Sequence, residues 1–315
     1  MSQPIALGID FGGTGIKPAV IRGAEILERG NVLDTQRLGS PGVITERLAE
    51  EIARLRERHP AVAGIGIGLP GMIDAEAGVI HGLSNVPGWE NFPLREILRE
   101  RTGLPVTLEN DAKAMAYGEW RHGAASAWRH VICITLGTGV GGGLILDGKL
   151  YRGAFNGAGE LGQTSIDVYG AATSGVYGNL GALEKSVGNR EIAQRASERY
   201  RQAGAEKSAE ECTPRQLSEA AAAGDAVARE VWETIGSEIG AALVNVIWLL
   251  NPECIVIGGG VAKAGAWLFD PIGRTIRERT MALYHEQLAI VPARLGSDAG
   301  AIGAAALGAE AAARG

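Results

Sequence analysis

The first half of the chain alternates between short apolar runs and segments with apolar residues at helical spacing. The apolar runs have the length of buried strands and cover residues 5–9, 62–69 and 106–108. The helical patterns cover residues 45–59, 94–101 and 112–121. Strands that alternate with helices in this way predict an α/β fold.

A strand–turn–strand pattern occurs twice along the chain. Residues 5–9 and 131–136 are each followed by a glycine-rich turn that contains Thr-Gly. A second apolar run then follows, at residues 16–21 in the first case and 144–146 in the second. We therefore predict an internal repeat, with two copies of one α/β unit.

Helix boundaries are marked clearly in the second half of the chain. Thr213-Pro214 has the residue types of an N-cap followed by proline at the first helical position. Asp225 is placed to cap a long helix with one apolar stripe, which Asn251-Pro252 ends. A strand is expected at residues 254–257 and a terminal helix at residues 299–313.

Glycine is unusually abundant, with 47 of the 315 residues, which is twice the usual ~7%. Hydrophobic residues still make up 46% and no G-x-y repeat is present, so collagen-like and disordered chains are excluded. A globular chain of this length favours two domains. The excess indicates many places where the backbone turns tightly or approaches a ligand.

Charge and cysteine usage narrow the class of protein. The formal net charge is −6 without blocks of like charge, which argues against nucleic acid as the main partner. Cys133, Cys212 and Cys254 are scattered and odd in number, as expected in a reducing cytoplasm. No basic segment or cleavage site precedes the first apolar run, so no secretory signal is predicted. The apolar stretch at residues 239–250 is shorter than the ~20 residues that a membrane-spanning helix needs.

Two segments match the dinucleotide pattern G-x-G-x-x-G. The first contains Gly66, Gly68 and Gly71, and the second Gly137, Gly139 and Gly142. That fingerprint requires a strand before it and a helix after it. The first segment leads into a turn and the second into another strand, so no Rossmann site is expected.

The two glycine-rich turns favour another kind of phosphate site, in which backbone N–H groups converge on the anion. Thr14 and Thr138 add hydroxyl donors, and Asp10 can hold Mg²⁺ near the phosphates, usually through water. Lys17 either adds a positive charge or points to solvent. Two ordinary hairpins are the alternative, but the likeness of the turns and a third glycine run, at residues 258–260, favour a nucleotide site.

Two carboxylates are candidates for chemistry on a hydroxylated substrate. Asp111 follows a predicted strand and opens a predicted helix, so it is either a helix N-cap or a general base for a hydroxyl proton. Glu160 lies among glycines, which suggests a group aimed at a polyhydroxy ligand. A solvated loop glutamate is the alternative there.

Taken in order, these motifs resemble those of the ROK family of sugar kinases, within the actin/hexokinase-like ATPase superfamily. The resemblance extends from Ile5 to Gly308, nearly the whole chain. The segments that carry it are 8–17 (GIDFGGTGIK), 66–71 (GIGLPG), 84–89 (SNVPGW), 108–112 (LENDA), 136–143 (LGTGVGGG), 157–162 (GAGELG) and 257–260 (IGGG). Chance alone does not explain such a set in this order.

The resemblance implies a fold and a domain organisation. The fold would be α/β, with two ribonuclease-H-like (actin-like ATPase) domains around a central cleft. Residues 1–112 and the C-terminal helix, 299–315, would form the smaller lobe, and residues 113–298 the larger one. The family commonly forms dimers or tetramers, so a homodimer or homotetramer is expected.

The resemblance also implies residue roles. Asp111 would be the catalytic base that deprotonates the sugar hydroxyl, and Asp10 would serve Mg²⁺ through water. The sugar would be bound by Gly71, Asn85, Asn110, Asp111, Glu160, Gln163 and Glu184. The ATP cofactor would be held by Asp10, Gly12, Gly13, Thr14, Lys17, Gly137, Thr138, Gly139, Gly258, Gly259 and Gly260.

The chain departs from the family at its structural zinc site. Most members hold zinc with one His and three Cys, and here the His position is Gln163 and the Cys positions are Gly175, Tyr177 and Ala182. Because zinc requires thiolate or imidazole ligands, no zinc is expected. Gln163 keeps hydrogen-bonding capacity but cannot carry a proton, so the choice of sugar stays open.

The implied activity is ATP-dependent phosphorylation of a hexose, with glucose preferred, at the 6-hydroxyl. The alternatives are a kinase for fructose, allose, N-acetylglucosamine or N-acetylmannosamine, polyphosphate as the donor, and a non-catalytic sugar sensor or repressor-like protein. Repressors of the family carry a helix-turn-helix ahead of the core, which begins here by Ile5, so a repressor is not expected. We expect a cytoplasmic enzyme with a small sugar as its partner and with neither a nucleic-acid nor a membrane partner.

Overall fold

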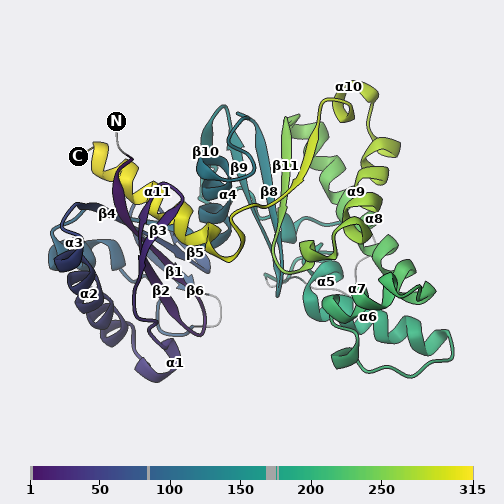
Figure 1. Cartoon of the computed structure of the whole chain (residues 1–315), viewed down its shortest axis with the longest axis horizontal. Helices are drawn as coiled ribbons and strands as arrows, with labels where there is room; N and C mark the ends of the chain where they lie inside the picture. The colour runs from purple at the N-terminus through teal and green to yellow at the C-terminus, as the bar shows by residue number, and fades with distance from the viewer. Residues whose placement is uncertain (1–2, 84–85, 168–174, 176, 315) are drawn as a thin grey trace. The chain divides into compact units, whose positions relative to one another are not determined.

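The computed structural model describes residues 3–83, 86–167, 175 and 177–314 (Figure 1). The chain divides into two compact units. Unit 1 comprises Met1–Arg129, Gly143–Gly159 and Arg294–Gly315, and unit 2 comprises His130–Gly142 and Glu160–Ala293. The lobe boundaries expected at residues 112 and 298 stay a prediction.

Unit 1 contains a five-stranded sheet with the order β3-β2-β1-β4-β7. Its strands are β1 (Ile5–Phe11), β2 (Ile16–Arg22), β3 (Glu25–Arg29), β4 (Val62–Leu69) and β7 (Val106–Asn110). The first three form antiparallel pairs, and β4 and β7 extend the sheet in parallel. The other elements of unit 1 include α1 (Thr35–Leu38), α2 (Pro41–Arg58), β5 (Gly71–Asp74), β6 (Val79–Leu83), α3 (Leu94–Thr102), α4 (Asp111–His122) and α11 (Ala299–Arg314).

A second five-stranded sheet has the order β10-β9-β8-β11-β12. Its strands are β8 (Val131–Leu136), β9 (Val140–Leu146), β10 (Lys149–Tyr151), β11 (Cys254–Gly258) and β12 (Ala289–Pro292). Numbered along the chain, the strands of both sheets follow the order 3-2-1-4-5, which confirms the predicted internal repeat. The helices of unit 2 are α5 (Glu184–Val187), α6 (Asn189–Gln202), α7 (Pro214–Ala222), α8 (Ala226–Leu250), α9 (Ala266–Arg279) and α10 (Ala282–His285).

Two predicted element boundaries are wrong. Helix α2 begins at Pro41 rather than at residue 45, because Ser40 Oγ accepts a hydrogen bond from Val43 N at 3.4 Å and proline fits the first helical position. Strand β9 begins at Val140 rather than at residue 144, so its glycines belong to the strand and not to the turn. A Cβ on Gly143 would lie 2.4 Å from the Ala116 Cβ of α4, so only glycine permits this close approach.

The long helix α8 begins and ends where the sequence predicts. Asp225 Oδ1 accepts a hydrogen bond from Ala228 N at 3.0 Å, and Asn251 ends the helix in a left-handed conformation. By length and composition alone α8 could cross a membrane, but half of its apolar window is buried inside the protein. Gly236 and Gly240 lie against α9, as in a core helix, since added Cβ atoms would come 2.4 Å from Pro271 and 2.7 Å from Thr275.

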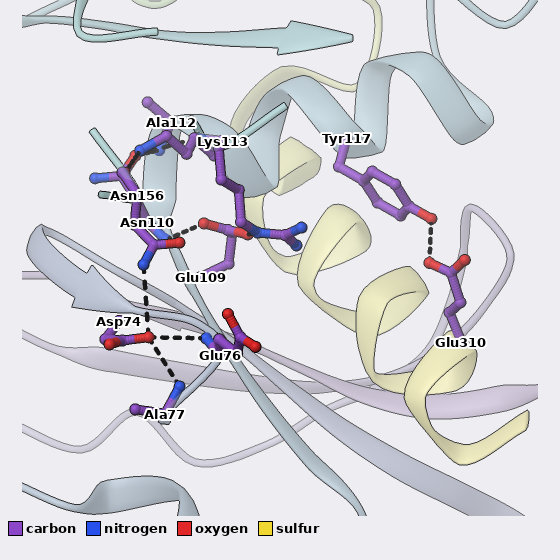
Figure 2. A network of polar contacts seen from close by, with 11 residues as sticks. Asp74, Glu76, Ala77, Glu109, Asn110, Ala112, Lys113, Tyr117, Asn156 and Glu310 are labelled. Carbon is purple, nitrogen blue, oxygen red and sulfur yellow. Dashed lines mark hydrogen bonds and ion pairs between the residues drawn. The ribbon is translucent and has the colours of Figure 1, made fainter. Parts of the chain in front are cut away.

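The two faces of the first sheet are covered differently. One face carries a core of large aliphatic side chains from the strands, α2 and α3. The other face is covered by α11, whose contacts are small residues such as Ala301 and Ala305. Helix α4 also packs on α11, where Tyr117 Oη donates to Glu310 Oε2 at 2.7 Å (Figure 2). Burial, followed by this hydrogen bond, raises the pKa of Tyr117 to about 12.

Candidate functional site

The end of β7 and the start of α4 bring Asn110 and Asp111 to the carboxyl edge of the first sheet. Asn110 is the N-cap of α4, because its Oδ1 accepts hydrogen bonds from Ala112 N at 3.1 Å and Lys113 N at 3.2 Å. Its Nδ2 donates to Gly71 O at 3.3 Å, on the neighbouring β5. The capping function considered for Asp111 therefore belongs mainly to Asn110.

Asp111 occupies the first helical position of α4, where its Oδ1 accepts a hydrogen bond from Ala112 N at 2.8 Å. The positive end of the helix dipole favours a carboxylate at this position. Gly71 has a φ of 120°, which side chains rarely adopt, so glycine is required where its carbonyl oxygen accepts from Asn110. The structure thus brings together three predicted sugar-site residues of unit 1.

A buried carboxylate directly precedes this pair and was not predicted from the sequence. Glu109 is 3% exposed, and its Oε2 accepts a hydrogen bond from Arg152 Nε at 2.7 Å. Its Oε1 accepts from Asn110 N at 3.0 Å. An ionised carboxylate can remain buried here because a guanidinium and an N–H group surround it.

A buried ammonium group follows the pair on α4. Lys113 is 2% exposed, and its Nζ donates to Asn156 O at 2.6 Å. Asn156 has a φ of 57° and donates through Nδ2 to Asp74 Oδ1 over a long 3.5 Å (Figure 2). Asp74 Oδ1 also accepts from the backbone N–H groups of Glu76 and Ala77. Side chains from β7, α4 and β5 therefore hold the segment after β10.

The first glycine-rich turn joins β1 to β2. Asp10 and Lys17 lie opposite each other in the strand pair, with Lys17 Nζ 3.4 Å from Asp10 Oδ2 and both side chains partly exposed. The turn closes through Gly12 N, which donates to Gly15 O at 3.0 Å. Thr14 is exposed at its tip. A carboxylate at a strand end beside an open turn has the oxygen ligands that Mg²⁺ prefers.

A further charged pair near this turn was also missed. Arg29 on β3 forms two hydrogen bonds of 2.9 Å to the carboxylate of Asp298, which precedes α11. The Arg29 guanidinium, through its hydrogen bonds and charge, lowers the pKa of Asp298, and the charge of Lys17 adds a smaller effect. Because 269 residues separate the partners, the local pattern gave no signal for the pair.

The remaining glycine segments follow two adjacent parallel strands of the second sheet, β8 and β11. Gly137 N donates to Gly139 O at 2.9 Å, and Gly137 O accepts from Asn189 N at 2.9 Å. Gly258 ends β11 and is followed by Gly259, which has a φ of 87°. A Cβ on Gly259 would lie 2.1 Å from Leu136 O, so glycine is required. Gly260, like Gly259, is exposed, as is Thr138.

Glu184, a predicted sugar-binding residue, contacts the second predicted phosphate-binding turn within unit 2. Its Oε2 accepts a hydrogen bond from Val140 N at 2.9 Å. A Cβ on Gly139 would come 2.4 Å from the same oxygen. One carboxylate oxygen of Glu184 is thus committed to the turn, which the sequence alone did not indicate.

Glu160 and Gln163 lie at the two ends of one short helical turn, with Gln163 N donating to Glu160 O at 3.0 Å. Partial burial and the negative charges of Glu160 and Glu184 raise the pKa of Tyr177. These two predicted sugar-binding carboxylates therefore act on the same tyrosine. The sequence motif identified Tyr177 only as one of the positions where the family has a zinc-binding cysteine, so this contribution was missed. Asn85, another predicted sugar-binding residue, lies outside the described residues.

The atoms at the family's zinc positions do not suit zinc. Gln163 Oε1 and Asn179 Oδ1 are buried and have no hydrogen-bond partner among the residues that the structure describes. A Cβ on Gly175 would come 2.8 Å from the first oxygen and 2.3 Å from the second, so amide groups fill the space of a cysteine. Within the described part of the chain, no group of three or more His, Cys, Asp or Glu is placed to hold a metal ion.

Comparison with known proteins gives a consistent result. The sequence matches the ROK family over residues 6–311. It is 36% identical over 314 residues to a glucokinase of Halalkalibacterium halodurans, spanning 96% of this chain and 94% of that protein.

Solved structures agree with this match. The ROK family glucokinase from Streptomyces griseus, in complex with glucose and AMPPNP, has a TM-score of 0.78 and 31% identity, and the match covers 97% of this chain and 99% of that one. A ROK family transcriptional regulator, a homolog of the E. coli MLC protein, has a TM-score of 0.86 and 31% identity, covering 98% and 78%. The expected α/β fold of the actin-like ATPase type is thereby confirmed.

Proposed function

Because the chain belongs to the ROK family and is similar over nearly its whole length to glucokinases, we propose that it is an ATP-dependent glucokinase that phosphorylates the 6-hydroxyl of glucose. The single observation that carries the proposal is the β7–α4 junction. There, Asn110 is the N-cap of α4, and the Asp111 carboxylate lies at the first helical position, at the positive end of the helix dipole. Kinases for fructose, allose, N-acetylglucosamine or N-acetylmannosamine are not favoured by these relatives.

In the proposed mechanism Asp111 is the general base. Its carboxylate accepts the proton of the 6-hydroxyl as the hydroxyl oxygen attacks the terminal phosphorus of ATP in line with the departing ADP. The backbone N–H of Ala112 and the N-terminus of α4 keep this carboxylate in a fixed position. Fixed geometry matters because phosphoryl transfer depends mainly on positioning and electrostatics.

The ATP phosphates are assigned to the open glycine turns. In these turns Gly12 N and Gly137 N already donate to Gly15 O and Gly139 O and so close the turns. The phosphates would meet the other backbone N–H groups of residues 12–14, 137–139 and 258–260 and the hydroxyls of Thr14 and Thr138, which are exposed. Asp10 suits Mg²⁺ held through water, since it supplies one partly exposed carboxylate. When bound, Mg²⁺ neutralises charge on the phosphates. Lys17 adds a positive charge beside Asp10.

Within unit 1 we assign sugar-binding roles to Gly71, Asn110 and Asp111. Within unit 2, taken by itself, we assign them to Glu160, Gln163 and Glu184. These groups supply carboxylate and amide hydrogen-bond partners of the kind that hydroxyl groups need. Gln163 would donate or accept through its amide where most of the family has histidine. A homodimer or homotetramer stays a prediction.

The test is an assay of ADP release across a panel of hexoses, with wild-type protein and Asp111→Asn. We expect turnover with glucose, and a loss of kcat of about 10²–10⁴-fold in the variant, because asparagine cannot accept the proton. Glucose binding, measured by calorimetry, should be retained. The matched control is Asp34→Asn at the N-cap of α1, which should keep full activity because asparagine caps equally well. Absence of turnover with every hexose would reject the kinase in favour of a sugar sensor, and equal loss of binding and turnover in Asp111→Asn would reject the base.

A further inference from the structure

Two charged contacts hold the segment after β10, residues 152–157, against the β7–α4 junction. Arg152 Nε donates to Glu109 Oε2 at 2.7 Å, and Lys113 Nζ donates to Asn156 O at 2.6 Å (Figure 2). Glu109 and Lys113 lie on either side of Asn110 and Asp111 in the sequence, so the anchors of the segment flank the proposed catalytic pair. The segment and its anchors all belong to unit 1.

These contacts are unusual because two of the charged side chains in them are almost fully buried. Lys and Glu are among the residues that are least often fully buried, yet Glu109 and Lys113 are 3% and 2% exposed. Burial of ionised groups costs desolvation free energy that pairing only partly offsets, so such contacts fix geometry more than they stabilise. Left-handed backbone at Gly153 and Asn156 shapes the same segment. These contacts and the left-handed backbone therefore define the position of residues 152–157.

The side chain that this segment exposes is aromatic. Phe155 is 94% exposed and directly precedes Asn156, whose carbonyl oxygen accepts from Lys113. A single exposed apolar residue is ordinary on a protein surface. Phe155 lies, however, on a segment whose anchors Glu109 and Lys113 flank Asp111 in the sequence. A phenyl ring with only two side-chain torsions offers an apolar face there at little cost in side-chain entropy. A hexose has a matching apolar face made by its ring C–H groups, which polar residues alone would leave unmatched.

We propose that Phe155 contacts the sugar and helps to select among hexoses, and that Glu109, Arg152, Lys113 and Asn156 are positioning residues that hold it in place. The proposal rests on the proposed function and deepens it, because it names a residue that determines the choice of sugar. Glu109 and Lys113 act through the segment that they anchor and not on the reacting atoms.

The first experiment compares wild-type protein with Phe155→Ala, using glucose, mannose and N-acetylglucosamine at saturating ATP, with equilibrium binding of each sugar by calorimetry. We expect the KM and Kd for glucose to rise about two- to tenfold, as for loss of one aromatic contact. The ratios of kcat/KM among the three sugars should shift, while kcat and the KM for ATP change less than about twofold. The matched control is Leu249→Ala on α8, where an 81% exposed apolar side chain should have no effect. Unchanged KM, Kd and sugar ratios in Phe155→Ala would overturn the proposal.

The second experiment tests the anchor with Arg152→Met, alone and combined with Phe155→Ala. We expect Arg152→Met to reproduce the shift in sugar ratios, Arg152→Lys to restore part of it, and the double variant to add little. Additive effects would show that Arg152 does not act through Phe155 and would overturn its positioning role. The control is Arg274→Met, which breaks the exposed Arg274–Glu233 pair.

The binding measurement separates this inference from the proposed function. If wild-type protein binds glucose without turnover and the Phe155→Ala variant binds glucose more weakly, the kinase activity is rejected. The contact between Phe155 and the sugar is then supported. A wild-type protein that binds no hexose would overturn both.

Discussion

Two groups of glycines in this protein meet opposite surroundings. Under α11, the glycines of β1 and β4 have no room for a side chain: added Cβ atoms would come 2.0, 2.4 and 1.7 Å from backbone oxygens at Gly8, Gly64 and Gly66. At three positions of the glycine-rich turns the reverse holds, whereas Gly139 and Gly259 in the same segments are tightly packed. Added Cβ atoms would meet no described atom within 4 Å at Gly13, Gly137 and Gly260.

The difference separates stability from binding. The first group lets a helix lie close on a sheet, so packing explains it completely. The second group, Gly13, Gly137 and Gly260, is under no packing constraint within the described structure. Under the proposed function, the approach of phosphates to the backbone would account for glycine at these positions. One residue type in similar sequence motifs thus serves two purposes that composition cannot distinguish.

The largest effect is expected for Gly66→Ala. Its Cβ would lie 1.7 Å from Ala304 O, so α11 or β4 must move, and the free energy of unfolding should fall by about 3 kcal/mol or more. Urea and thermal unfolding measure the change. A stability equal to wild type would show that α11 is not seated on β4 as described.

A smaller effect of another kind is expected for Gly137→Ala. The methyl group has space in the protein but would occupy the proposed path of the phosphates, so the KM for ATP should rise about tenfold, or ~1.4 kcal/mol, with unchanged stability. Steady-state kinetics at saturating glucose and a melting curve test both parts. The control is Gly42→Ala in the first turn of α2, which also has open space and should leave the KM for ATP unchanged. Destabilisation of Gly137→Ala comparable to that of Gly66→Ala would remove the distinction between the two groups.

The smallest effect is expected for Glu184→Gln, which tests how the second turn is held. A neutral amide oxygen can still accept from Val140 N, but without the extra strength of a charged acceptor. The KM values for ATP and for glucose should therefore both rise about two- to fivefold. A change confined to glucose would show that the contact with the turn has no functional role.

Much of the fold could be predicted because its signals are local. The apolar runs predicted seven of the ten strands of the two sheets but not β3, β10 and β12. Thr213, Asp225 and Asn251 marked helix ends through side chains that act within a few residues. The repeat was visible because both copies begin with the same strand–turn–strand pattern. The start of β9 was placed wrongly because its glycines were assigned to a turn, whereas they belong to the strand, and Gly143 packs against α4.

The candidate site was only partly predictable. Asn110 and Asp111 were visible as a pair between a strand and a helix, but the sequence could not decide which of them caps α4. In the structure Asn110 is the cap, and its amide also donates to Gly71 O, 39 residues away, a contact that no local pattern indicates. Arg152 and Asn156 are each 43 residues from the side chains that hold them, so no local pattern pointed to those contacts.

The sequence by itself determined the α/β repeat, the helix caps, the glycine turns and the absence of zinc-binding residue types at Gln163, Gly175, Tyr177 and Ala182, since each depends on residue type or short-range pattern. Only the tertiary structure decided which glycines pack against a helix and which have open space around them. It also decided which residues the buried side chains of Glu109 and Lys113 contact. These features depend on distances between segments far apart in the chain. Such distances are fixed only when the strands and helices pack together.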